Sequence, residues 1–269
     1  PGRREFRVGG FSNGNIDVFD ITNPLAPARI VGGSIDPEGS FYQVSFEQPA
    51  SGAARYLALS PSRWLTPAAI TPDAPSNLKS AANGADYVVV SHADFMSAIQ
   101  PLAAYRAGQG LRVKVVDVQD VYDEFNGGVF DPGAIQSFLA YAYSHWTPPA
   151  PSYVLLVGDG HYDFKDYYGG SDPNYIPPFL GEFDPWIGET ASDNRYVTIS
   201  GGDMLPDMYI GRLPANSAAE VTAMVNKIIA YETEPLQGDW NTRLTFVADN
   251  ADAGGNFPAS SDAIADHAL

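Results

Sequence analysis

Residues 86–118, "DYVVVSHADFMSAIQPLAAYRAGQGLRVKVVDV", change periodicity twice and decide the fold. They begin with a short, continuous apolar run, which predicts a buried strand. Phe95, Ile99 and Leu102 then recur at helical spacing, and this segment ends in glycine before a second apolar, β-branched run. A strand, a helix and a second strand in this order predict two parallel strands joined by a crossover helix.

The same alternation continues along the chain. "DPGAIQSFLAYAYSHW" predicts a helix with Asp131 at the N-cap and Pro132 at the first helical position, a favoured pairing. "YVLLVGD" (153–159) predicts a third strand. "SAAEVTAMVNKIIAYE" predicts a helix that begins with a capping box of Ser217 and Glu220.

Two further elements complete the expected sheet. "RYVTISGGDMLPDMYIGR" (195–212) predicts a β-hairpin, and "RLTFVAD" (243–249) predicts another strand. Strands that alternate with helices indicate an α/β fold with a mostly parallel sheet and helices on both faces.

The region before this rhythm has a different character. Residues 1–70 contain short apolar runs with turn residues about every ten positions, which predicts part of an antiparallel β-sandwich. Residues 71–85 are rich in Pro, Ala, Ser and Asn and predict a linker. We therefore expect a partial β-sandwich-like domain, a linker, and an α/β domain from residue 86 to residue 269.

The composition excludes several classes of protein. Lys and Arg number 15 against 32 Asp and Glu, a net charge of −17, so nucleic acid is an unfavourable partner and cations are favourable ones. Cysteine is absent, which excludes a disulfide, a thiolate zinc site and a cysteine nucleophile within these residues. No apolar run is long enough to span a membrane, and no signal peptide opens the chain, which begins without Met as a fragment or a processed product would.

Carboxylates mark the expected carboxyl edge of the sheet. Asp159 ends a predicted strand, and Asp203 and Asp207 lie in the turn of the predicted hairpin. If that hairpin folds back over the edge, the three carboxylates could share one Ca²⁺ with turn carbonyls. The alternative is that they cap turns and helices.

His161 lies two residues after Asp159. The sequence contains no G-x-S-x-G motif that would supply a serine nucleophile to it, and no second His lies at helical spacing to form a zinc site. We therefore expect His161 to be a loop residue that is hydrogen-bonded to backbone.

Several segments together resemble the gingipain family of secreted cysteine peptidases. They are "ADYVVVSHADFMSAIQPLAAYRAGQGLRVKVVDVQDVYDEF", "AIQSFLAYAY", "YVLLVGD" and, most specifically, "SDNRYVTISGGDMLPDMYIGRLPANSAAEVTAMVNKIIAYE". The resemblance runs from about residue 86 to residue 269. It implies the first subdomain of a caspase-like catalytic unit, preceded by part of a β domain.

The resemblance also implies roles for particular residues. Asp159, Asp203 and Asp207 match a calcium site of the family. Asp252, one residue out of step with the family's "AEGG"-like turn, is a candidate for the acid that orients the catalytic His. Asp262 matches a position that faces the substrate's basic side chain in arginine-specific members; a helix N-terminal acid favoured by the dipole is the alternative.

By the same resemblance, the catalytic His and Cys belong to a second subdomain beyond this sequence. We expect the N-terminal part of a cysteine endopeptidase, secreted or on the cell surface, that is inactive alone and acts on protein or peptide together with the remaining subdomain. The alternatives are a non-catalytic, calcium-stabilised extracellular or assembly module, and a sortase-like member of the family.

Overall fold

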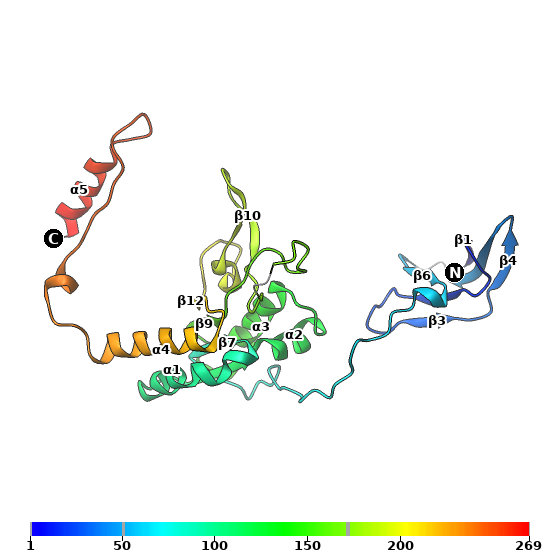
Figure 1. The fold of residues 1–269 in the computed structure, drawn as a ribbon, viewed down its shortest axis with the longest axis horizontal. Coiled ribbons are helices and arrows are strands. Elements are labelled where there is room, and N and C mark those ends of the chain that lie inside the picture. Colours follow the sequence, from blue (N-terminus) through cyan, green and yellow to red (C-terminus); the bar gives the residue numbers. More distant parts are fainter. Residues whose placement is uncertain (1, 50–51, 171–172, 269) are drawn as a thin grey trace. The chain divides into compact units, whose positions relative to one another are not determined.

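The structure is a computed structural model that describes residues 2–49, 52–170 and 173–268. It forms two compact units, Pro1–Asp73 and Ala74–Leu269. The first is coloured blue to cyan in Figure 1, and the second runs from cyan through green to red. Each unit is described by itself.

The first unit contains two three-stranded antiparallel sheets. One has the order β1 (Arg3–Phe11), β5 (Phe41–Pro49), β4 (Ser34–Glu38). The other has the order β3 (Ala28–Ile30), β2 (Asp17–Asp20), β6 (Tyr56–Leu59), and a 3₁₀ turn, η1 (Pro61–Arg63), follows. Alternate residues Val44 and Phe46 of β5 face Ile16 and Val18 in one small core. This confirms the predicted antiparallel sandwich portion.

The second unit is built on four parallel strands in the order β12, β9, β7, β8. Their bounds are β7 (Tyr87–Ser91), β8 (Val113–Asp117), β9 (Tyr153–Val157) and β12 (Tyr209–Leu213). β7 and β9 are central and continuously apolar, as strands covered on both faces must be.

Helices cover both faces of this sheet. The layer of α1 (Met96–Gly108) and α4 (Ala218–Thr233) packs on Val89 and Leu155. The layer of α2 (Val118–Asn126) and α3 (Pro132–His145) packs on the neighbouring Val88 and Val154, because successive side chains of a strand point to opposite faces. The predicted α/β class is confirmed (Figure 1).

The predicted helix starts agree with the structure. Asp131 accepts a hydrogen bond from the backbone N–H of Gly133 at 2.7 Å, with Pro132 as the first residue of α3. Ser217 accepts from the N–H of Glu220 at 3.3 Å. The Glu220 carboxylate completes the cap one residue earlier than in a standard capping box, on the N–H of Asn216 at 2.7 Å.

The hairpin predicted at 195–212 is wrong. The chain instead forms a 3₁₀ turn, η3 (Asp193–Val197), and then a loop that leads into β12, which pairs in parallel with β9. The Asp207 carboxylate accepts hydrogen bonds from the N–H groups of Ile199 and Ser200, both at 2.8 Å, so these two donors are not available to a second strand. A true hairpin lies earlier, formed by β10 (Leu180–Asp184) and β11 (Gly188–Ala191).

The strand predicted at 243–249 is also wrong. This segment has no assigned secondary structure, and Leu244 and Val247 are 60% and 89% exposed. A strand needs a partner for its ladder, and no described residue pairs with this segment. The short turn η4 (Asp239–Thr242) precedes it and helix α5 (Phe257–Ala268) follows.

The segment before β7 lacks regular structure but joins the second unit from residue 74 onward. Leu78 is 3% exposed in the core, and Glu124 of α2 accepts hydrogen bonds from Ser76 and from the N–H of Lys79. The expected linker thus contains residues that pack on the α/β unit.

Among the described residues, no helix has the length and apolar character needed to cross a membrane.

Candidate functional site

The carboxyl ends of β9 and β12 bring polar residues together. The N–H of Gly158 donates to the carbonyl of Leu213, and the N–H of Asp159 donates to that of Ala215, both at 3.0 Å. These bonds prolong the parallel pairing beyond the strands. The Asn216 side-chain amide then donates to the Asp159 carboxylate at 3.2 Å. This edge is where open α/β sheets bind their ligands.

Asp159 anchors the long loop that follows β9. Its carboxylate accepts from the N–H of Gly160 at 2.9 Å. Its backbone carbonyl accepts from the N–H groups of Tyr175 and Ile176 at 3.0 and 3.1 Å, which closes the loop onto its own start.

Two glycines allow this close return of the chain. Gly158 has φ +138°, and a Cβ there would lie 2.7 Å from the Tyr175 Cβ. A Cβ on Gly160 would lie only 2.1 Å from the carbonyl oxygen of Ile176. The "GDG" spacing after β9 therefore reflects backbone approach within this loop.

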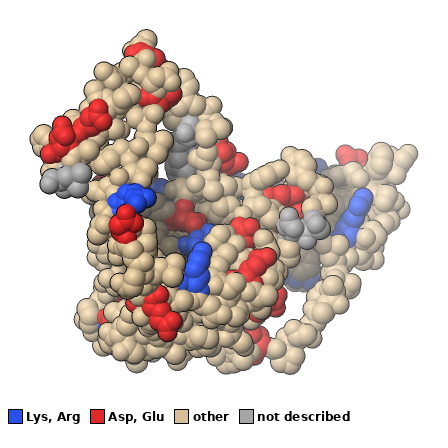
Figure 2. Space-filling model, turned by 60° about the vertical axis from the view of Figure 1, so that its left-hand side comes forward, with Lys and Arg blue, Asp and Glu red and all other residues tan. Residues whose placement is uncertain are grey.

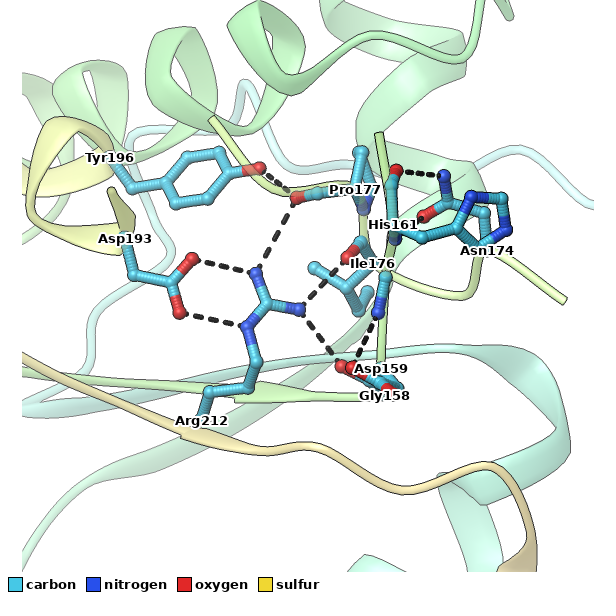
Figure 3. A network of polar contacts seen from close by, with 10 residues as sticks. Gly158, Asp159, His161, Asn174, Ile176, Pro177, Asp193, Tyr196 and Arg212 are labelled. Atoms are coloured by element: carbon cyan, nitrogen blue, oxygen red, sulfur yellow. Dashed lines mark hydrogen bonds and ion pairs between the residues drawn. The ribbon is translucent and has the colours of Figure 1, made fainter. Parts of the chain in front are cut away.

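Arg212 of β12 is a largely buried residue at the same edge, and its guanidinium bonds to residues of the surrounding loops (Figure 3). Its guanidinium forms a two-bond ion pair with Asp193 of η3, with both contacts at 2.8 Å. It also donates to the carbonyls of Gly158 and Ile176 at 2.9 and 2.8 Å, and more weakly to that of Pro177. We call these five residues the Arg212 network.

The Arg212 network is largely withdrawn from water. The Arg212 side chain is 14% exposed and that of Asp193 is 30% exposed. Burial lowers the pKa of Arg212, but the hydrogen bonds and charge of Asp193 outweigh it and leave the pKa raised, so the guanidinium is permanently charged. Tyr196, whose pKa burial raises, donates to the Pro177 carbonyl beside it. The network stabilises the loop and leaves Arg212 engaged with the protein itself.

The two histidines at this edge bond to backbone. His161 Nδ1 accepts from the N–H of Asp163 at 3.2 Å, and Asn174 bonds the His161 backbone on both sides (Figure 3). His92 Nδ1 accepts from the N–H of Asp94 at 3.3 Å, and its ring packs edge-on against Tyr175. The sequence-based interpretation of His161 as a backbone-bonded loop residue agrees with this geometry.

The three aspartates predicted to bind calcium do not form a cluster. Asp203 is exposed and accepts from the N–H of Leu205 at 3.0 Å, while Asp207 holds the 199–200 turn described above. Within the described ranges, no group of three His, Asp or Glu side chains is close enough to hold a metal ion. The carboxylates as placed do not fit a Ca²⁺ shell of six to eight oxygens.

The two candidate residues near the end of the chain are exposed. Asp252 accepts from the N–H of Gly254 at 2.7 Å and forms an isolated bridge with Gly255. Asp262 lies in the second turn of α5, on a solvent-exposed position. Neither contacts the carboxyl edge through any bond found among the described residues.

Arg212 and Asp193 were not predicted as partners. The signal was present, because an arginine inside the apolar strand "YIGRL" requires a buried anion or carbonyl. Nothing in the spacing identified Asp193, Gly158 or Ile176 as that partner, because they come from loops that meet Arg212 only in the fold.

Fold and site together define an α/β protein with polar residues at the carboxyl edge of its parallel sheet and no cysteine in its sequence. A model of peptidase family C25, a family of cysteine peptidases, matches residues 80–268. The chain belongs to this family, which confirms the resemblance to gingipains. No curated protein matches the sequence.

The fold agrees with that of one solved structure, PorU, and two others are reported beside it for their sequence identity and coverage. Dimeric latent PorU from Porphyromonas gingivalis shares 21% identity with a TM-score of 0.64, over 92% of this chain and 25% of that one. The complex of pro- and mature domains of RgpB from P. gingivalis shares 22% identity over 67% and 38% of the two chains, with a TM-score of 0.45. The Arg-specific cysteine proteinase gingipain R (RgpB) shares 24% over 68% and 38%, with a TM-score of 0.47. The chain thus spans about a quarter of PorU and less than half of the others.

Proposed function

We propose that this chain is the N-terminal part of a gingipain-like cysteine endopeptidase, comprising part of a β domain and the first catalytic subdomain. The observation that carries the proposal is the family match over residues 80–268 in a sequence without any cysteine. A cysteine peptidase requires a thiolate to attack the peptide carbonyl and a His to shuttle the proton. In this proposal both come from another part of the protein.

In this proposal the described residues form the structural part of the domain that lies beside the catalytic groups. The Arg212 network fixes the loop after β9 against β12 without using any side chain that the chemistry needs. Protein or peptide is the substrate, and the location is extracellular or the cell surface, by analogy with the family.

Thiol dependence of the full-length protein tests this proposal. We expect it to hydrolyse casein, and iodoacetamide to abolish that hydrolysis. Residues 1–269 alone should show none. Hydrolysis that survives iodoacetamide would contradict the proposal. Absence of hydrolysis by the reduced full-length protein would favour the non-catalytic module or a sortase-like transferase. A transpeptidation assay with an amine acceptor distinguishes these two, because only the transferase would form product.

Asp262 is proposed as the residue that receives the substrate's basic side chain, and Asp252 as the acid that orients the catalytic His. A bidentate pair with a guanidinium supports the first role. We expect the full-length enzyme to cleave after Arg or Lys, and Asp262→Asn to lower kcat/KM for such substrates by about 30-fold or more. Asp266→Asn, on the same helix and also exposed, is the matched control. A preference for apolar residues before the cut would exclude this role.

Calcium at Asp159, Asp203 and Asp207 stays a proposal, supported by the family resemblance and opposed by the separation of these carboxylates. Binding would require the 199–207 loop to rearrange. If the ion binds there, EGTA lowers the melting temperature of the wild-type chain, and Asp203→Ala removes that effect. A melting temperature that EGTA leaves unchanged would exclude the site. A fall of several degrees that Asp203→Ala abolishes would establish the site.

A further inference from the structure

The sequence contains three Asn-Gly pairs, which begin at Asn13, Asn83 and Asn126. In such a pair the backbone nitrogen of the glycine can attack the side-chain carbonyl carbon of the asparagine and expel ammonia. Glycine favours this reaction because it has no Cβ to hinder the approach and adopts a wide range of backbone conformations. The attack also requires a carboxamide that is free to turn toward the nitrogen. The three pairs differ in this freedom in the folded protein.

The carboxamide of Asn83 is held through both of its polar atoms. Its Nδ2 donates to the carbonyl of Asn77 at 2.7 Å and, more weakly, to that of Leu78 at 3.4 Å. Its Oδ1 accepts from the Lys114 Nζ at 2.9 Å. The backbone is fixed as well, because the Asn83 carbonyl accepts from the N–H of Thr147 at 2.7 Å. A turn of this carboxamide toward Gly84 would break several of these bonds together, so the pair is protected.

Asn126 is protected mainly at the glycine nitrogen. It is the last residue of α2, and the N–H of Gly127 donates to the carbonyl of Tyr122 at the helix end. Gly127 has φ +62°, the left-handed conformation that commonly ends a helix. The Asn126 Nδ2 donates to the carbonyl of Val129 at 3.2 Å. The attacking nitrogen is therefore engaged with the helix, and the carboxamide is engaged with the loop that follows it.

Asn13 lacks restraints of this kind. It is exposed in the connection between β1 and β2, which belong to different sheets, so no hairpin ladder flanks the pair. Within the described part of the chain, residues 12–15 form no backbone–backbone hydrogen bond. The Asn13 Oδ1 accepts from the nearby N–H of Asn15 at 3.0 Å, and no described residue accepts from its Nδ2. The carboxamide can therefore reach the Gly14 nitrogen at the cost of one local bond.

We propose that Asn13 undergoes spontaneous deamidation in the folded protein, whereas Asn83 and Asn126 are protected from it. The Gly14 nitrogen forms a bond with the Asn13 Cγ, the Cγ–Nδ2 bond breaks, and ammonia leaves with the proton that Gly14 loses. Water then opens the cyclic imide at one of its two carbonyls. One opening gives an aspartate, and the other gives an isoaspartate, whose main chain runs through Cγ. The net reaction consumes water and releases ammonia, and it does not depend on the proposed function.

The two products should differ in their effect on the first unit. An aspartate keeps an oxygen that can accept from the N–H of Asn15. Its added charge is a small change in a chain of net charge −17, and acidic side chains are already scattered over the face drawn in Figure 2, with fewer basic ones between them. An isoaspartate instead lengthens the main chain shortly before Ile16 and Val18, which lie in the small core of this unit. We therefore expect the isoaspartate, rather than the charge, to destabilise the unit.

Peptide mapping by mass spectrometry tests the inference on the 269-residue chain, incubated in a mildly alkaline buffer. All three pairs are measured in one sample, so each serves as a control for the others. We expect Asn13 to convert at least about tenfold faster than Asn83 or Asn126 in the folded chain. In concentrated urea the three rates should become similar, because each asparagine is then unrestrained and is followed by glycine.

Thermal unfolding tests the expected consequence. The incubated wild type should melt at a lower temperature than the fresh protein. Asn13→Asp, which produces the aspartate directly, should melt as the fresh wild type does. Asn13→Gln should keep its own melting temperature after the same incubation, because its longer side chain would have to close a larger and less favourable ring.

Three outcomes would overturn the inference. The first is conversion of Asn83 or Asn126 as fast as that of Asn13 in the folded chain. The second is a ranking of the three pairs that persists in urea, since local sequence rather than the fold would then set the rates. The third is an equal fall in melting temperature for incubated wild type and incubated Asn13→Gln. None of these measurements involves proteolysis, so failure of the proposed function would leave them unchanged.

Discussion

Replacing Arg212 by methionine is expected to lower the free energy of unfolding by about 3–5 kcal/mol. The change removes the guanidinium and leaves the Asp193 carboxylate and the carbonyls of Gly158 and Ile176 without their donor in a largely dry site. Urea unfolding followed by near-ultraviolet circular dichroism measures the loss. The free energy of unfolding of Arg212→Lys should fall between those of the wild type and Arg212→Met, because an ammonium keeps the charge but cannot form the planar two-bond pair.

The control for this prediction is Arg243→Met. Arg243 also pairs with an aspartate, Asp239, at 2.7 Å, but both side chains are exposed, at 64% and 81%. Surface pairs of this kind contribute little, so we expect a change below about 0.5 kcal/mol. A loss of less than 1 kcal/mol in Arg212→Met would show that the Arg212 network does not stabilise the sheet edge.

Gly160→Ala is expected to lower the free energy of unfolding by about 2–3 kcal/mol, because the new methyl group cannot fit without displacing the chain. Its Cβ would lie 2.1 Å from the Ile176 carbonyl oxygen, and that carbonyl is itself held by Arg212. Thermal unfolding and hydrogen exchange of the Tyr175 and Ile176 amides measure the effect.

Gly211→Ala provides the comparison for this second prediction. Its Cβ would meet no atom closer than 4.0 Å, the Leu155 Cδ1, so it should be tolerated. Equal stability of the two alanine variants would mean that the loop after β9 is not held against Asp159 as described.

The elements that the sequence predicted correctly are those whose signal is local. Residues 87–90 and 153–157 are continuous apolar runs of strand length, and the cap at Asp131 depends only on its immediate neighbours. Local patterns of this kind do not depend on which part of the chain lies opposite.

The failures concern segments whose structure depends on a distant partner. Residues 195–212 have the alternation and turn residues of a hairpin, but Tyr196 and Val197 are fully buried beneath the loop, and β12 finds β9 instead. Residues 243–249 have the composition of a strand without a described neighbour to pair with. The Arg212 network escaped prediction for the same reason, since its other members lie 19 to 54 residues from Arg212 in the sequence.

The calcium hypothesis combines a strand end that the structure contains with a hairpin that it does not contain. Asp159 lies at the carboxyl end of β9, as predicted. The predicted hairpin does not exist, and Asp203 lies in an exposed turn, where its carboxylate accepts a hydrogen bond from the N–H of Leu205. Position along the sequence gave the strand end, but only the three-dimensional path of the 199–207 loop could decide which carboxylates meet.

The most direct test of the central claim is the position of the reactive thiol in the full-length protein. Labelling with a peptidyl chloromethyl ketone, followed by peptide mapping, identifies the residue that attacks the substrate carbonyl. We predict a single labelled cysteine that lies outside residues 1–269, with its labelling lost when the protein is unfolded. A label on any residue within 1–269 would contradict the account.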